Sequence, residues 1–210
     1  MQQVRLYTFD IPDEIDLGKS VAIDTETMGL NHNRDRLCLV QISAGDGYCS
    51  LVHFPEPTFS KSKNLKKMFE DDSVEKIFHY GRFDLAVLMK SFNINISNVY
   101  CTKIASKLVR TYTNGHSLRA LCKELLDIDL NKTSQTSDWG ASTLSLDQIN
   151  YACFDVLYLH NLKKKLDALL AREGRSDLAK ACFEFLPYRA KLDLLASEEF
   201  DIFAHSSIKN

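Results

Sequence analysis

Three stretches near the N-terminus decide the fold: VAIDTET at residues 21–27, LCLVQIS at 37–43 and GYCSLVHF at 47–54. All three are rich in the β-branched and aromatic residues that favour strands. Gly45-Asp46-Gly47, between the second and third stretches, is typical of a hairpin turn. This region therefore predicts a meander of three strands.

Beyond residue 60 the pattern alternates between helix and strand. Further strands are expected at 76–80 (KIFHY) and 98–101 (NVYC). The expected helices cover about 64–71, 83–92, 102–112, 118–126, 145–173 and a segment from 176 that ends before Pro187, and a last helical piece is expected after it. A meander followed by strand–helix units favours a mixed sheet of about five strands with helices on both faces, the ribonuclease H-like α/β architecture. We expect residues 1–210 to form a single domain with a helical C-terminal extension over about 176–210.

Composition narrows the possible functions. The chain has 26 Lys and Arg against 28 Asp and Glu, a formal net charge of −2, which counts against a broad basic face for long duplexes. Neither a G-x-G-x-x-G nor a phosphate-binding loop occurs, so nucleotide-cofactor folds lose support. The six cysteines show no C-x-x-C spacing and predict reduced thiols. With no secretory signal and no apolar run of membrane-spanning length, a cytoplasmic protein without membrane association is expected.

Two carboxylates stand close together on the first predicted strand. Asp24 and Glu26 are two residues apart, so both side chains project from one face. A lone D-x-E is more often a strand end emerging into water, because like charges side by side repel each other. Asp24 and Glu26 therefore indicate a functional site only in combination with further residues of the chain.

A third carboxylate lies on the long predicted helix. Between residues 149 and 162 (INYACFDVLYLHNL) the only formal charge is Asp155, and Tyr151 shares its helix face. An uncompensated carboxylate on a buried helix must take up a proton or bind a cation. A solvated Asp beside a packing Tyr is the alternative reading.

A fourth carboxylate, Asp84, opens the helix after the strand KIFHY. Stabilisation of the helix dipole explains an Asp in a first turn equally well. Taken together, four carboxylates without a His or Cys partner suit hard cations such as Mg²⁺ or Mn²⁺. Two such ions about 4 Å apart could act on a phosphodiester, and they would supply positive charge that the surface lacks.

The ordered set of motifs resembles a known enzyme family. Asp24-x-Glu26, Asp84 and Tyr151-x-x-x-Asp155 are similar to the three motifs of the DEDDy 3′–5′ exonucleases of the ribonuclease D-like group. The sequence around these motifs is similar as well, in the stretches DTETMGL, KIFHYGRFDLAVL and SDWGASTLSLDQINYACFDVLYL. CTKIASKLVRTYT and AKACFEFLPYRAKLDLL are similar to the short nano-RNase C branch of that group.

The resemblance implies a metal-dependent exoribonuclease for short RNA, down to dinucleotides, that releases nucleoside 5′-monophosphates. Asp24, Glu26, Asp84 and Asp155 would hold two divalent cations, Mg²⁺ or Mn²⁺, and Tyr151 would orient the attacking water. It also implies a homo-oligomer, an octameric ring. The alternatives are a broader exonuclease that trims single-stranded RNA or DNA, including tRNA precursors, and a catalytically silent RNA-binding module.

Weaker candidates for substrate binding surround these motifs. They are Met28, Gly29, Leu30, His79, Arg82, His116, Ser117 and Arg119. The first three could wedge against a base, as the family's apolar residue there does, or pack at a corner. The residues from 116 to 119 open a helix, where a phosphate site and a simply capped helix start are both possible. For His79 and Trp139 a structural role is the simpler reading, and the apolar tail residues Phe200, Ile202 and Phe203 could pack on the same chain or on a neighbour.

Overall fold

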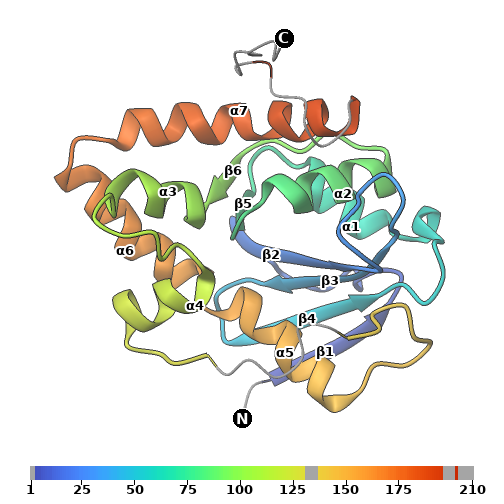
Figure 1. Ribbon diagram of the computed structural model, residues 1–210. Coiled ribbons are helices and arrows are strands. Elements are labelled where there is room, and N and C mark those ends of the chain that lie inside the picture. The colour runs from blue at the N-terminus through green and yellow to red at the C-terminus, as the bar shows by residue number, and fades with distance from the viewer. Residues whose placement is uncertain (1–2, 131–136, 196–201, 203–210) are drawn as a thin grey trace, which may run out of the picture.

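The computed structural model describes residues 3–130, 137–195 and 202. These residues form one six-stranded mixed sheet in the order β1-β4-β3-β2-β5-β6 (Figure 1). The strands are β1 (Gln3–Thr8), β2 (Ser20–Thr27), β3 (Leu37–Ser43), β4 (Tyr48–His53), β5 (Glu75–Phe78) and β6 (Val99–Cys101). The pairs β2–β3 and β3–β4 are antiparallel, which confirms the meander, whereas β1–β4, β2–β5 and β5–β6 are parallel.

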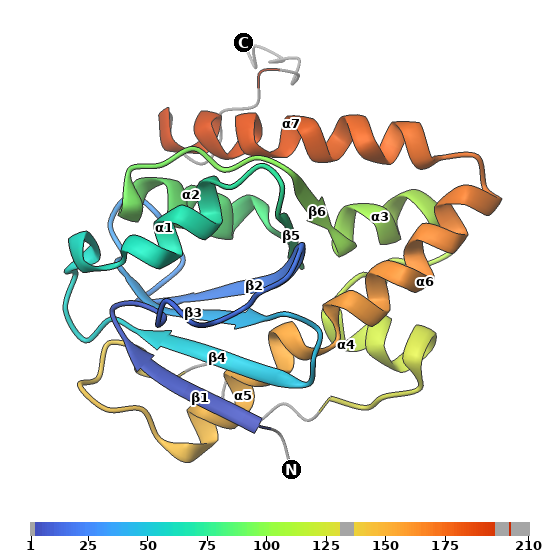
Figure 2. The same cartoon turned by 180° about the vertical axis from the view of Figure 1, so that it is seen from behind.

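Helices cover both faces of this sheet (Figures 1 and 2). The helical segments are η1 (Phe59–Lys61), α1 (Lys63–Glu70), α2 (Arg82–Phe92), α3 (Thr102–Val109), α4 (Leu118–Leu121), the π turn η2 (Cys122–Leu126), α5 (Leu146–Leu157), α6 (Leu159–Arg172) and α7 (Ser176–Leu195). Alternate residues of β2 point to opposite faces, so Val21 and Ile23 join the core under α1, α2 and α7, while Ala22 joins the core under α3, α5 and α6. The mixed sheet with helices on both faces and a helical C-terminal region was therefore predicted correctly.

The sheet has one strand more than the sequence predicted. β1 pairs in parallel with β4 at the edge of the sheet, and none of its residues is fully buried. Only Val4 and Tyr7 of this edge strand pack against the two cores, so its hydrophobic alternation is weak and the sequence pattern misses it.

Two predicted helix boundaries are also wrong. The expected helix at 145–173 is divided at Tyr158 into α5 and α6, although it ends near Gly174 as expected. The helix that begins at 176 does not stop before Pro187: α7 continues through it to Leu195, so the two predicted pieces are one helix. Pro187 is buried together with Leu186 and Ala190, so packing against the rest of the domain offsets the lost backbone hydrogen bond.

The thiols agree with the expectation of reduced cysteines. All six cysteines are free, five of them buried. Among the helices of the described segments, none is long and apolar enough to cross a membrane. Of the tail, Phe200 and Phe203 lie outside the described residues.

Candidate active site

Three of the predicted carboxylates meet where β2 approaches α5. Asp24 and Glu26 leave β2 on the same face, and Asp155 comes from α5, which packs against β2, β3 and β4. One oxygen from each of the three carboxylates lies within 4.8 Å of the other two. A strand and a helix far apart in the sequence thus form one cluster of oxygen ligands.

Local sequence explains why α5 holds its position. Ser145 accepts a hydrogen bond from the Gln148 backbone N–H, and the Gln148 side chain accepts one from the Ser145 backbone N–H. This capping box starts the helix. Ala152, Cys153 and Val156 then bury the face of α5 beside Asp155. The Asp155 carboxylate therefore extends from a helix whose position is fixed by the capping box and by the packing of its buried face.

The fourth carboxylate is held by the residue between the first two. Asp84 is 5 % exposed in the first turn of α2, and its Oδ1 accepts a hydrogen bond of 2.6 Å from the Thr25 hydroxyl. Thr25 thereby links the D-x-E strand to the start of α2. The helix-dipole explanation for Asp84 is incomplete, because a solvated first-turn Asp would not be buried against a neighbouring strand.

Burial raises the pKa of all four carboxyl groups, and repulsion from neighbouring carboxylates adds to the rise at Asp24, Glu26 and Asp155. Burial is the largest cause in each case. It raises the pKa of Glu26 to about 9 with help from Asp155 and Asp84, and that of Asp24 well above its usual value. The pKa values of Asp84 and Asp155 rise to about 7. A divalent cation would relieve this repulsion, so the donor set fits Mg²⁺ or Mn²⁺.

Tyr151 lies in the same pocket, one helical turn before Asp155. Burial and the carboxylates, Asp155 first, raise the pKa of its hydroxyl, so the phenol stays protonated. Its ring lies 6.2 Å from that of Trp139, centroid to centroid. Trp139 is only 3 % exposed, which confirms the core role that was the simpler reading.

The pocket has a volume of about 450 Å³. Four of the weaker sequence candidates line it with the carboxylates: Leu30, His79, Ser117 and Arg119. His79 is structural as well, since its Nδ1 lies 2.9 Å from the Thr102 hydroxyl and burial lowers the pKa of the ring to about 3.

Two of these lining residues also serve the scaffold. Ser117 caps α4 by accepting a hydrogen bond from the Ala120 backbone N–H. Arg119 forms an ion pair of 3.1 Å with Asp129. The capped helix start is therefore confirmed, and it lies at the pocket wall.

The other weaker candidates lie away from the wall of this pocket. Arg82 forms an ion pair with Asp193, and the Ser106 hydroxyl lies 2.8 Å from Nδ1 of His116. Met28 is 59 % exposed and approaches Gly140. Gly29 belongs to the loop that carries Leu30.

The sequence singled out none of six further lining residues: Thr25, Tyr80, Lys103, Leu118, Leu130 and Phe154. The Lys103 ammonium lies 4.0 Å from the centroid of the Tyr80 ring, a cation–π contact. Tyr80 lies two residues before α2 and has a positive φ of 66°, which is unusual for an aromatic residue. Lys103 is the second residue of α3, which follows β6 directly, and this place just after a strand was the one signal in the sequence.

Comparison with known proteins agrees with this geometry. A family model described as 3′–5′ exonuclease matches residues 10–171. The structure of Brucella melitensis NrnC bound to pGG is 52% identical, with a TM-score of 0.94 over 98% of this chain and 100% of that chain. Brucella melitensis NrnC with bound Mg²⁺ is 51% identical, with a TM-score of 0.92 over 97% of this chain and 100% of that one.

Longer relatives share only this domain. Ribonuclease D of Gluconacetobacter diazotrophicus is 32% identical over 157 residues, which are 75% of this chain and 39% of the relative. The chain thus spans about two fifths of that ribonuclease D. The family match covers more than half of this chain, and the NrnC match extends over nearly all of it. The chain therefore belongs to the 3′–5′ exonuclease family, and it is similar to NrnC and to ribonuclease D.

Proposed function

We propose that this exoribonuclease degrades very short RNA, down to dinucleotides, from the 3′ end and releases nucleoside 5′-monophosphates. The observation that carries the proposal is the cluster of Asp24, Glu26 and Asp155, whose oxygens lie within 4.8 Å of one another in a pocket that Tyr151 also lines. Support for a short substrate comes from NrnC, which is similar over nearly the whole chain and has been solved with pGG.

Asp24, Glu26 and Asp155 would hold divalent cations, with Asp84 contributing to the second of two. Mg²⁺ is supported by the NrnC structure that contains it, and Mn²⁺ by the shared preference for carboxylate oxygen. Two such ions stabilise the attacking and leaving oxygens of a phosphodiester displacement. The 2.6 Å hydrogen bond from Thr25 fixes Asp84 beside the strand that carries Asp24 and Glu26.

Tyr151 would orient the attacking water rather than deprotonate it. A general base works best when its pKa is near the working pH, and burial moves the pKa of this phenol upward, away from neutrality. The protonated hydroxyl can still donate or accept a hydrogen bond. We therefore assign Tyr151 to positioning the water beside the scissile phosphate.

The pocket wall supplies the substrate contacts in this proposal. Leu30, 85 % exposed, would pack against a base, with Met28 and Gly29 forming the loop around it. Ser117 and Arg119, with His79 behind them, would contact phosphate. Arg82 and His116 would support this wall indirectly, through Asp193 and Ser106.

The domain and its assembly complete the proposal. Residues 1–210 would act as one catalytic domain. The octameric ring implied by the family resemblance and the cytoplasmic location expected from the sequence remain predictions. A second candidate function is broader trimming of single-stranded RNA or DNA 3′ ends, including tRNA precursors. The similarity to ribonuclease D favours that alternative.

Substrate length separates the two functions. The purified protein would be incubated with Mn²⁺ and 5′-labelled RNAs of two, seven and twenty nucleotides, beside an Asp155→Ala control. Rapid loss of the dinucleotide, with the longer strands lagging, supports the proposal. Equal or faster trimming of the long strand would replace it with the broader function, and binding without release of mononucleotides would leave only a silent RNA-binding module.

A further inference from the structure

The C-terminal helix α7 lies outside the span of the exonuclease family match, which ends at residue 171. Figures 1 and 2 show α7 lying across α2 and α3, and it packs against α2 more extensively than against any other element. Since α2 begins two residues before Asp84, the packing brings the end of α7 close to the second sequence motif. This contact suggests a role for α7 in the site itself.

Asp193, near the end of α7, joins three parts of the chain. Its Oδ2 accepts a hydrogen bond of 2.5 Å from Arg82 Nε, and its Oδ1 accepts bonds of 2.7 Å from Arg82 and from Arg189. Its backbone carbonyl oxygen lies 2.9 Å from His32 Nε2. The carboxylate is only 9 % exposed. Bidentate pairing with Arg82 gives this contact a defined geometry.

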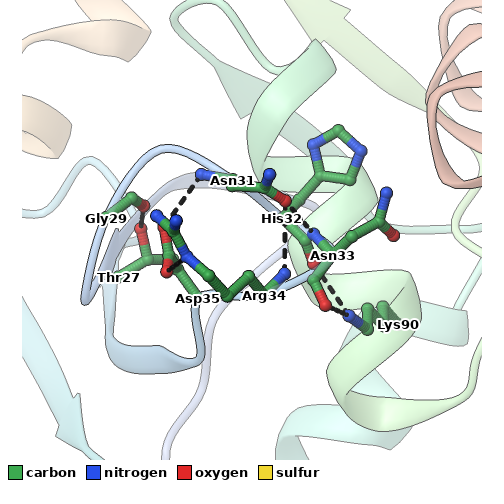
Figure 3. Close-up of polar contacts among 8 residues, drawn as sticks. All are labelled: Thr27, Gly29, Asn31, His32, Asn33, Arg34, Asp35 and Lys90. Atoms are coloured by element: carbon green, nitrogen blue, oxygen red, sulfur yellow. Dashed lines mark hydrogen bonds and ion pairs between the residues drawn. The ribbon is translucent and has the colours of Figure 1, made fainter. Parts of the chain in front are cut away.

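His32 belongs to a loop, residues 28–35, that follows the D-x-E strand. Figure 3 shows how polar contacts hold this loop. Asp35 accepts a hydrogen bond of 3.0 Å from the Asn31 backbone N–H and pairs with Arg34. Lys90 of α2 donates to the backbone carbonyls of His32 and Asn33, at 3.0 and 2.6 Å. The loop is thus fixed from within, from α2 and, through His32, from α7.

This loop presents Leu30 to the substrate pocket. Leu30 is 85 % exposed and lines both the pocket of the carboxylates and an adjoining cavity of about 260 Å³. His32, Arg82 and Asp193 line that second cavity, and Tyr80 lines both. The Asp193 cluster and the pocket are therefore neighbours that share the side chains of Leu30 and Tyr80.

We propose that Asp193 is a positioning residue that sets the place of Leu30 in the substrate pocket. Its pairing with Arg82 fixes the end of α7 against the start of α2, so that its carbonyl meets His32 and holds the loop. This inference rests on the proposed function, because it concerns how the same pocket receives short RNA. No metal ligand touches Asp193, so the residue affects substrate binding rather than cation binding.

Asp193→Asn tests the pairing with little change in shape. We expect KM for a dinucleotide to rise about tenfold with kcat nearly unchanged, since misplacing a substrate-binding group by about 1 Å can cost ten- to a hundredfold. Asp193→Glu should restore part of the loss. Asp177→Asn, an exposed residue on the same helix, is the matched control and should leave both constants unchanged.

Two further readouts separate positioning from a general loss of stability. In a Leu30→Ala background the effect of Asp193→Asn on KM should largely disappear, because the position of an absent side chain no longer matters. Without substrate, hydrogen exchange should accelerate at the backbone amides of Asn31, Arg34 and Asp35, all hydrogen-bonded within the loop. If Asp193→Asn does not fold, His32→Phe removes the link to the Asp193 carbonyl while keeping the aromatic contact with Phe83.

The outcomes are distinct. Additive effects with Leu30→Ala, a fall in kcat with unchanged KM, or a shifted Mg²⁺ dependence would overturn the positioning role. Unchanged amide exchange in the loop would also overturn it, whatever the substrate. Failure of the wild-type protein to cleave a dinucleotide would instead overturn the proposed function, and the exchange experiment would still report on the loop.

Discussion

Replacing Asp155 by Asn should stabilise the protein when no divalent cation is present. Asp155, like Glu26, has no hydrogen bond or ion pair among the described residues, and burial followed by repulsion from Asp84 raises its pKa from 3.8 to about 7. Asn has nearly the same shape and no charge. Because the substitution removes an uncompensated buried charge and little else, its effect on stability measures the electrostatic cost of the site.

The size and the sign follow from the pKa difference. The shift is about 3 units, and at about 1.36 kcal/mol per unit the ionised carboxylate costs up to about 4 kcal/mol at pH 8. Since the folded state binds this proton more tightly than the unfolded state, stability falls as the pH rises from about 4 to about 7. The advantage of Asp155→Asn should therefore be largest at pH 8 and should vanish near pH 4.

Urea unfolding of both proteins in EDTA, from pH 4 to pH 8, measures this difference directly. Asp147→Asn is the matched control, since Asp147 is exposed on the same helix and should show no comparable gain with pH. Saturating Mg²⁺ should reverse the order, because it stabilises the wild type through ligands that the variant lacks. A variant no more stable than wild type at pH 8 in EDTA would refute the electrostatic reasoning.

Three further predictions concern the same site. Tyr151→Phe should lower kcat about a hundredfold while leaving the Mg²⁺ affinity measured by calorimetry unchanged, since the hydroxyl orients water; weaker Mg²⁺ binding would contradict this role. Mg²⁺ affinity should increase from pH 6 to pH 9, because protons compete for carboxyl groups whose pKa values reach about 9 at Glu26; a flat titration curve would count against the cluster as the binding site. Gly29→Ala should lower the free energy of unfolding by about 1–3 kcal/mol and raise KM, because the new Cβ would lie 2.3 Å from Asp35 Oδ2. An unchanged urea midpoint would contradict this, since it would mean that the loop adjusts to the added methyl group.

The carboxylate site was predictable from sequence because its signals are local. Asp24 and Glu26 share a face through strand alternation, and the apolar spacing around Asp155 identifies a buried helix with one unpaired charge. Each signal alone had a simple structural explanation. Their order along the chain, together with the family resemblance, made the combination specific, and the fold brings the predicted carboxylates of β2 and α5 together.

What could not be predicted depends on contacts between distant parts of the chain. Pro187 locally signals the end of a helix, yet α7 continues because Leu186 and Ala190 are buried against the domain. Arg82 was a candidate for substrate binding because it lies near a motif, but its partner Asp193 lies 111 residues away and no local pattern links the two. Such ion pairs also determine which arginine and lysine side chains stabilise the fold and which are available to bind substrate. The substrate-binding residues are therefore harder to predict than the metal ligands. A group of carboxylates without nearby basic residues can be seen in the sequence and indicates a metal site, because buried like charges need a counter-ion. The role of an arginine depends on whether the fold places an acidic partner beside it, which the sequence does not show.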